Sequence, residues 1–277
     1  MNIFEAIALG ALQGLTEFLP VSSSGHLVLL QKIFGIEEPA LFFDTMLHVG
    51  TLFAVFAVLW ADIWAILKKI IQPMTAFIIL GTIPTVIVAL VFKDSIEAAF
   101  STGGALGFAF LITTAALCLS EVLATNLTNN TNSIKKGSSA SINWINSLII
   151  GLCQAIAIIP GVSRSGMTLS GALACGVDRN KAAHFSFLLS IPAILGALVL
   201  QVKDLIDEGG TAFAASESSI GIAAIVAGTV TAAIVGFFSV RFMLKIVRQH
   251  RLWGFGIYTG VLGVLVLVDR YATHFFF

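Results

Sequence analysis

Apolar residues run along this chain in long blocks, and six of the blocks are long enough to cross a membrane. A membrane-spanning helix needs about 20 mostly apolar residues. The six predicted spans cover residues 41–60, 74–92, 103–123, 182–202, 219–240 and 253–269. The pattern therefore predicts an all-α polytopic membrane protein.

Two further apolar stretches, residues 3–35 and 145–176, are interrupted in the middle. The first breaks at Pro20-Val-Ser-Ser-Ser-Gly25 and the second at Pro160-Gly-Val-Ser-Arg-Ser-Gly166. Each half is too short to cross a bilayer, so both stretches are predicted to be re-entrant helix–loop–helix hairpins. Non-helical backbone is tolerated at membrane depth only where it is buried in protein or lines a wet cavity. The alternative is a Pro/Gly kink in one long helix, which explains the clustered hydroxyls and the arginine less well.

The order of one hairpin and three spans occurs twice, which predicts a duplicated chain. Six residues of the first hairpin recur without a gap 141 residues later, and they are Gly10, Gln13, Val21, Ser22, Ser24 and Gly25. A weaker similarity links Gly81-Thr82 to Gly228-Thr229. Because three spans is an odd number, the second repeat must be inverted relative to the first. Inverted repeats with broken helices commonly build a site near the bilayer midplane, where the two hairpin tips are expected to meet.

The repeats are predicted over residues 1–125 and 143–277, joined by a polar linker at 126–142. Ten lysines and arginines fall on the linker's side of the predicted spans, against three on the other side. Short cytoplasmic loops carry an excess of Lys and Arg. The bias places the linker in the cytoplasm and both termini outside, so that the first hairpin opens toward the outer face.

Composition agrees with a membrane protein. The chain is 57% hydrophobic and 11% charged, whereas a soluble domain carries about 25% charged residues. The net charge of zero gives no indication of a nucleic-acid partner. Cys118, Cys153 and Cys175 lack metal-ligand spacing and are interpreted as small core residues.

Ionisable side chains at membrane depth are costly, so each is a functional hypothesis. Four are found here: Glu17, His26 and Arg164 in the hairpins, and His48 in the first span. Glu17 follows Gln13 by four residues, which places both on one helical face. His48 is interpreted either as a core polar group or as a partner that supports the site, and Gln154 as another such partner.

The two interrupting loops each lead into a helix, where free backbone N–H groups and the helix dipole favour an anion. Serine hydroxyls add hydrogen-bond donors, and Arg164 adds a planar fork suited to phosphate oxygens. Serine-rich turns alone are weak evidence, because hydroxyls cap helices routinely. Arg164 could also neutralise Glu17 as a structural bridge between the repeats, and the two interpretations are compatible.

Three motifs resemble the BacA/UppP family of undecaprenyl-diphosphate phosphatases: Gln13-x-x-x-Glu17, Pro20-Val-Ser-Ser-Ser-Gly-His26 and Pro160-Gly-Val-Ser-Arg-Ser-Gly-Met-Thr168. Length, element order and motif spacing agree over essentially the whole chain. Some relatives have a second Glu at the position of Gln13, so Glu17 is the acidic group expected to act here.

The resemblance implies hydrolysis of undecaprenyl diphosphate to undecaprenyl phosphate and inorganic phosphate in the bacterial cytoplasmic (inner) membrane. This reaction recycles the lipid carrier for peptidoglycan and other cell-wall polymers. The resemblance also implies a divalent cation, Mg²⁺ or Ca²⁺, with Glu17 as its expected ligand, and bacitracin resistance on overproduction.

With this activity, Arg164 is expected to stabilise the transferred phosphoryl group, and Ser23 is the favoured nucleophile with His26 in proton transfer. Attack by His26 or by water stays open, and Glu17 acts as base or metal ligand. The residues expected to bind the diphosphate are Gln13, Ser22, Ser24, Ser163, Ser165 and Thr168. A polyprenyl-phosphate transporter or flippase is the competing hypothesis, and a non-catalytic scaffold would leave the charges unexplained. Small residues on several spans leave a homodimer open.

Overall fold

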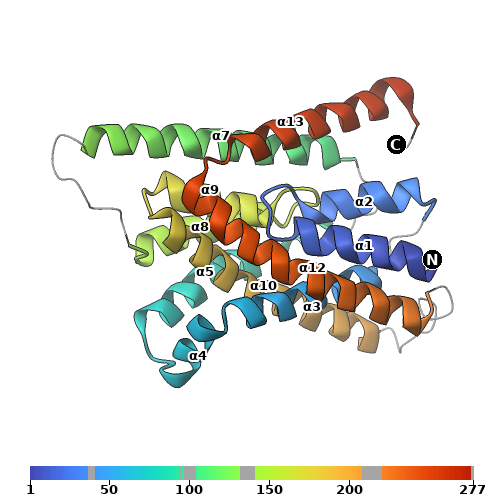
Figure 1. Ribbon diagram of the computed structural model, residues 1–277, viewed down its shortest axis with the longest axis horizontal. Coiled ribbons are helices and arrows are strands. Elements are labelled where there is room, and N and C mark those ends of the chain that lie inside the picture. Colours follow the sequence, from blue (N-terminus) through green and yellow to red (C-terminus); the bar gives the residue numbers. More distant parts are fainter. Residues whose placement is uncertain (37–40, 94, 97–103, 132–140, 208–219, 276–277) are drawn as a thin grey trace.

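The computed structural model describes residues 1–36, 41–93, 95–96, 104–131, 141–207 and 220–275. Long helices make up these ranges (Figure 1). Residues 132–140 of the predicted linker, and the first residues of the spans predicted at 103 and 219, lie outside the described part of the chain.

Both interrupted stretches form two helices joined by a loop. The first consists of α1 (Ile3–Thr16) and α2 (Ser23–Ile33), and the second of α8 (Trp144–Ile156) and α9 (Arg164–Ala174). α1 packs against α2 and α8 against α9, so the chain turns back at each loop instead of continuing as one kinked helix. Side chains cap the returning helices: the Ser22 Oγ accepts from the N–H of Gly25 at 3.2 Å, as serine commonly does at this position.

The remaining helices are α3 (Leu41–Val58), α4 (Trp60–Lys68), α5 (Pro73–Val91), α7 (Leu106–Thr131), α10 (Arg179–Asp207), α12 (Ile222–Gln249), α13 (Trp253–Val268) and the short π-helical turn η1 (Asp269–Thr273). By length and composition, five helices of the described chain can cross a membrane. A sixth span results if α3 and α4, which meet at an angle of 79°, are taken together. The prediction of a polytopic helical membrane protein is confirmed.

Several helices continue beyond the predicted ends of the apolar stretches. α7 runs to Thr131, past the predicted start of the linker at residue 126, and α12 runs to Gln249 instead of residue 240. The apolar pattern marks only the part of a helix that suits lipid. Backbone hydrogen bonding can carry the helix further into polar sequence, so hydropathy does not fix its ends.

The first hairpin packs against a helix of the second half, and the second hairpin packs against a helix of the first half (Figure 1). α1 lies on α12 and α8 lies on α5. Each contact is made through glycine. A Cβ atom on Gly10 would lie 2.3 Å from the carbonyl oxygen of Gly228, and one on Gly151 would lie 2.4 Å from that of Gly81. Small residues let membrane helices approach this closely. The four glycines form two matching pairs between the halves, Gly10 with Gly151 and Gly81 with Gly228.

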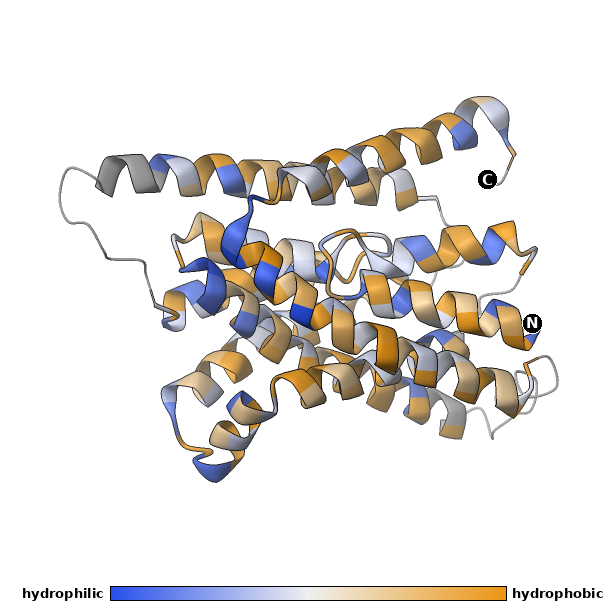
Figure 2. Ribbon diagram, viewed as in Figure 1, coloured by the Kyte–Doolittle hydropathy of each residue, from blue (hydrophilic) through white to orange (hydrophobic). Residues whose placement is uncertain are grey.

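The two hairpins enter from opposite ends of the molecule, and their loops meet near its middle (Figure 1). α7 and α13 form a pair along one side. Apolar colour extends along most of the helices in Figure 2, with hydrophilic residues concentrated toward helix ends. Large apolar side chains such as Ile79 and Phe238 are exposed, as expected where helices face lipid. The fully buried Phe18 packs edge-on against Phe187 of α10, with ring centroids 5.6 Å apart, and thereby fixes the first loop.

A buried ion pair far from the two loops joins three parts of the chain. Glu121 of α7 is fully buried, and its Oε2 lies 2.5 Å from Nη2 of Arg179 at the start of α10. Its Oε1 accepts from the N–H of Leu252, between α12 and α13, at 2.8 Å. Removing one partner of a buried pair leaves the other charge uncompensated.

We expect Glu121→Ala to lower the free energy of unfolding by about 3–5 kcal/mol, because it strands the Arg179 guanidinium and the Leu252 N–H. Thermal unfolding in detergent would measure the loss. Asp62→Ala provides the control: Asp62 pairs with His184 at 3.0 Å, but both side chains are more than a third exposed, so a change below about 1 kcal/mol is expected. Equal effects of the two substitutions would contradict the prediction.

Candidate active site

Side chains from each loop bind the backbone of the other loop. The N–H of Gly161 donates to Ser24 Oγ at 3.3 Å, and Ser165 Oγ donates to the carbonyl oxygen of Leu19 at 2.8 Å. Ser24 and Ser165 occupy equivalent positions in the two hairpins. Both hydroxyls were predicted to bind phosphate, and the structure adds a second role, because together they hold the loops in register.

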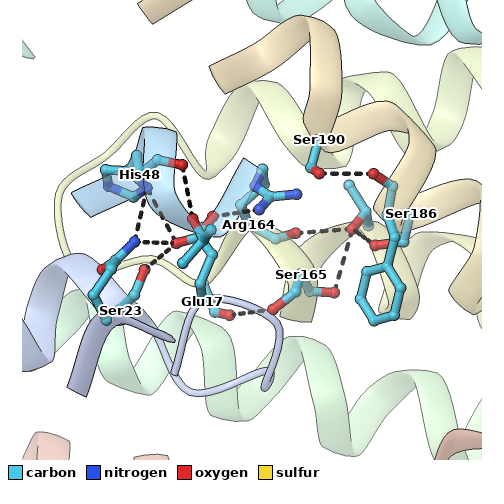
Figure 3. Close-up of polar contacts among 12 residues, drawn as sticks. Glu17, Ser23, His48, Arg164, Ser165, Ser186 and Ser190 are labelled. Carbon is cyan, nitrogen blue, oxygen red and sulfur yellow. Dashed lines mark hydrogen bonds and ion pairs between the residues drawn. The ribbon is translucent and has the colours of Figure 1, made fainter. Parts of the chain in front are cut away.

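Glu17, at the end of α1, lies at the centre of the polar cluster (Figure 3). Its Oε1 lies 2.5 Å from Nη2 of Arg164, so the carboxylate of one hairpin pairs with the guanidinium of the other. Its Oε2 accepts from Ser23 Oγ at 2.6 Å and from Gln13 Nε2 at 2.9 Å. Glu17 is 5% exposed. The predicted bridge between the hairpins is therefore present, within hydrogen-bond distance of the predicted nucleophile.

His48 of α3 joins this cluster directly. Its Nδ1 lies 2.9 Å from Gln13 Nε2 and 3.3 Å from Glu17 Oε2. An amide nitrogen only donates, so the two hydrogens of Gln13 Nε2 can serve Glu17 and His48 together if His48 Nδ1 accepts. Of the two interpretations of His48, the structure supports that of a partner to the site.

The loops enclose a cavity of about 170 Å³. Its walls are formed by Glu17, Ser22, Ser23, Ser24, His48, Ala157, Val162, Ser163 and Arg164. A single buried water needs only about 10–15 Å³, so the cavity has room for a group the size of phosphate. α2 and α9 both begin at its edge, and their N-terminal N–H groups favour an anion there.

Arg164 has hydrogen-bonding capacity that the protein does not use. Glu17 takes Nη2, whereas the buried Nη1 has no hydrogen-bond partner among the described residues. A buried, unsatisfied guanidinium nitrogen is costly. Arg164 thus neutralises Glu17 and lines the cavity, while its second terminal nitrogen has no partner among the described residues.

Five of the predicted residues do not line the cavity. Gln13 Nε2 donates to Glu17, and Ser165 Oγ donates to the carbonyl oxygen of Leu19. His26 is directed toward α13, where its Nε2 lies 2.7 Å from the hydroxyl of Tyr258. Thr168 is fully buried within α9 and lies 2.6 Å from Ser186 Oγ of α10. Gln154 donates to Thr85 of α5 at 3.0 Å. Direct contact of these side chains with a phosphate in the cavity has no support from this geometry.

Two residues that support the loops were not found by sequence reasoning. Tyr258 bonds and stacks with His26, and Thr113 of α7 accepts the N–H of Ser163 at 3.0 Å. Nothing in the sequence marks Thr113 as a contact of the loop, because threonine in a membrane helix commonly bonds its own backbone. Tyr258 could have been noticed as a polar aromatic residue in an apolar span, since the chain has only two tyrosines.

The family model described as "Bacitracin resistance protein BacA" matches residues 6–265 of this chain. The chain belongs to this family. A protein of Carboxydothermus hydrogenoformans named undecaprenyl-diphosphatase is 44% identical over 275 residues, which cover 99% of this chain and all of that protein. Undecaprenyl-diphosphatase 4 of Bacillus thuringiensis is 41% identical over the full length of both chains. The undecaprenyl-diphosphatase of Halothermothrix orenii is 39% identical over 97% of this chain and 98% of its own length.

Proposed function

We propose that this protein is a phosphatase of the bacterial cytoplasmic membrane that hydrolyses undecaprenyl diphosphate to undecaprenyl phosphate and inorganic phosphate. Full-length relatives named for this activity support the proposal. The observation that carries it is the cluster of Glu17, Ser23 and Arg164 at the cavity between the hairpin tips. They combine a base with a hydroxyl nucleophile and an anion-stabilising cation, each of which lies within hydrogen-bond distance of the Glu17 carboxylate.

Arg164 is proposed to bind the diphosphate together with the start of α9. Nη1 is buried and has no partner among the described residues, and the guanidinium would turn both terminal nitrogens toward the phosphate as Nη2 leaves Glu17. The fork then contacts phosphate with both nitrogens, in the geometry that makes arginine a strong phosphate ligand. Charge that develops on the transferred phosphoryl group is stabilised by the same donors, which is the largest contribution that protein groups make to such reactions.

Ser23 is proposed as the nucleophile. Its hydroxyl donates to Glu17 Oε2 at 2.6 Å, which is the relation of an activated nucleophile to its base. Ser23 Oγ would bond to the terminal phosphorus as the bond to the bridging oxygen breaks, with its proton passing to Glu17. Undecaprenyl phosphate leaves, and water then hydrolyses the phosphoserine to inorganic phosphate. Direct attack by water, with Glu17 as base, remains the alternative.

A divalent cation is part of the proposal. Among the described residues, no group of three or more His, Cys, Asp and Glu is placed to hold a metal ion. Glu17 supplies one carboxylate beside the cavity, and the buried Oε1 of Gln13 has no hydrogen-bond partner in the part of the chain that the structure describes. Mg²⁺ is often held by one or two carboxylates and by substrate phosphates. The residues fit a cation of this kind, which would neutralise phosphate charge when bound.

An inverted repeat and an outward-facing site complete the proposal. The paired glycine contacts of α1 with α12 and of α8 with α5 support two equivalent halves. The opposed directions of the hairpins support their inversion, and the Lys and Arg bias supports termini outside and a cavity that opens to the outer face. A homodimer stays a prediction.

Purified protein in detergent, given undecaprenyl diphosphate and Mg²⁺ or Ca²⁺, is expected to release one phosphate for each undecaprenyl phosphate formed. Phosphate assay and lipid chromatography would measure both products. A flippase needs binding and alternating access but no nucleophile, so the hydrogen bond between Ser23 and Glu17 favours chemistry. Binding without phosphate release by folded protein would favour transport instead.

A further inference from the structure

A tyrosine of the last span contacts the first hairpin across 232 residues of sequence. The Tyr258 hydroxyl of α13 lies 2.7 Å from Nε2 of His26, and the two rings stack at 14° with centroids 5.6 Å apart. Phe110 of α7 packs edge-on against His26, with ring centroids 5.7 Å apart. His26 is 8% exposed, so its ring is held by two aromatic neighbours and by the hydrogen bond at Nε2.

The hydrogen bonds of His26 determine which of its nitrogens carries the proton. Nδ1 lies 2.7 Å from the carbonyl oxygen of Ser22. A carbonyl oxygen only accepts, so Nδ1 must carry a hydrogen. In the neutral ring Nε2 then has none and accepts the hydrogen of the Tyr258 hydroxyl. The bonds form one directed chain, from Tyr258 to His26 and from His26 to the backbone of Ser22.

Ser22 is the strained residue of the first loop. Its φ of 72° and ψ of 95° lie in a region that non-glycine residues rarely adopt, and surrounding contacts must maintain such a conformation. The His26 ring holds its carbonyl oxygen, and its own hydroxyl caps Gly25. The next residue is Ser23, whose hydroxyl reaches Glu17 at 2.6 Å. The direction of the Ser23 side chain therefore depends on the backbone that His26 fixes.

We propose that Tyr258 is a positioning residue for the hydrolysis, acting through His26 and Ser22 to aim the Ser23 hydroxyl at Glu17. The inference rests on the proposed role of Ser23 as nucleophile. It makes His26 a positioning residue as well, in place of the predicted role in proton transfer. The last span is thereby coupled to the reacting hydroxyl, although none of its residues lines the cavity.

Tyr258→Phe tests the first link, because it removes the hydroxyl and keeps the ring that stacks on His26. We expect kcat to fall about three- to tenfold, the effect of one lost hydrogen bond, with KM unchanged. Tyr271→Phe is the matched control: Tyr271, the second tyrosine of the chain, is 65% exposed in η1, and kcat should not change. A Tyr258→Phe enzyme with wild-type kcat, or with its loss confined to KM, would overturn the inference.

His26→Asn and His26→Gln separate positioning from proton transfer. An asparagine amide nitrogen reaches about the place of Nδ1 and can still donate to Ser22, whereas a glutamine amide extends toward the place of Nε2. We expect His26→Asn to lose about three- to tenfold in kcat, as Tyr258→Phe does, because only the bond to the tyrosine is lost. His26→Gln, which also loses the donor to Ser22, should lose at least about 30-fold. Equal loss of turnover in both folded variants would assign His26 to proton transfer and overturn the inference.

The double variant tests whether Tyr258 acts through His26. In the His26→Asn background the Tyr258 hydroxyl has no Nε2 to bond, so adding Tyr258→Phe should change kcat no further. A full additional loss of kcat would show that Tyr258 has an independent, structural role and overturn the inference.

Ser23→Ala distinguishes failure of this inference from failure of the proposed function. If Ser23→Ala retains wild-type kcat, the nucleophile assignment fails. An inactive Ser23→Ala together with an unaffected Tyr258→Phe overturns only the role of the tyrosine.

Discussion

Arg164→Ala is expected to lower kcat/KM for undecaprenyl diphosphate by at least about 1,000-fold, the size of effect seen when an arginine that stabilises a transferred phosphoryl group is lost. The substitution removes a guanidinium that lines the cavity and whose Nη1 has no partner among the described residues. Arg164→Lys keeps the charge without the fork, so it should recover part of the loss. Steady-state phosphate release measures both variants.

Arg179→Ala is the matched control for this prediction. Arg179 pairs with a buried glutamate, Glu121, at the same 2.5 Å distance as Arg164 pairs with Glu17, but neither Arg179 nor Glu121 lines the cavity. It should lower thermal stability while turnover in the folded fraction stays near the wild-type value. Glu17 keeps hydrogen bonds from Ser23 and Gln13 when Arg164 is removed, so Arg164→Ala protein should still fold. Near-normal turnover of Arg164→Ala would contradict the assigned role.

The spans and the loops were predictable because lipid imposes a length on apolar runs, and polar residues inside such runs are too costly to be accidental. The duplication of the hairpin also made the pairing of Glu17 with Arg164 predictable, because a carboxylate in one copy and a guanidinium in the other indicate a shared site. Helix ends and the sharp bend between α3 and α4 were not predicted. Both depend on packing and interfacial contacts that hydropathy does not encode.

Side-chain direction was the part of the site that sequence could not provide. His26 follows the serine-rich turn and was placed with the reacting groups, yet it faces α13 because the first turn of α2 rotates it away from the cavity and toward Tyr258. His48 was left between two interpretations because its helix has no local motif. Its position became clear only from the contact with Gln13. Contacts between distant helices leave little trace in one sequence.

Ser23→Ala is expected to lower kcat by about 10,000-fold or more if Ser23 forms a covalent intermediate, since losing a nucleophile removes nearly all of the chemical acceleration. The phosphoserine should be detectable by acid quenching during turnover of substrate labelled in its terminal phosphate. Ser24→Ala is the neighbouring control: its hydroxyl accepts the Gly161 N–H, so losing it should reduce turnover only about tenfold through loosened loops.

The size of the Ser23→Ala effect separates the two chemical routes. If water attacks directly, Ser23 only orients Glu17 or that water, so Ser23→Ala should lower kcat by no more than about 100-fold. Glu17→Gln should abolish turnover in either route, because the base is lost. Label retained on protein from wild type but absent from Ser23→Ala would establish the covalent route. Turnover above about a hundredth of wild type in Ser23→Ala, without labelled protein, would assign the attack to water and leave Ser23 as a hydrogen-bond partner that aligns the Glu17 carboxylate.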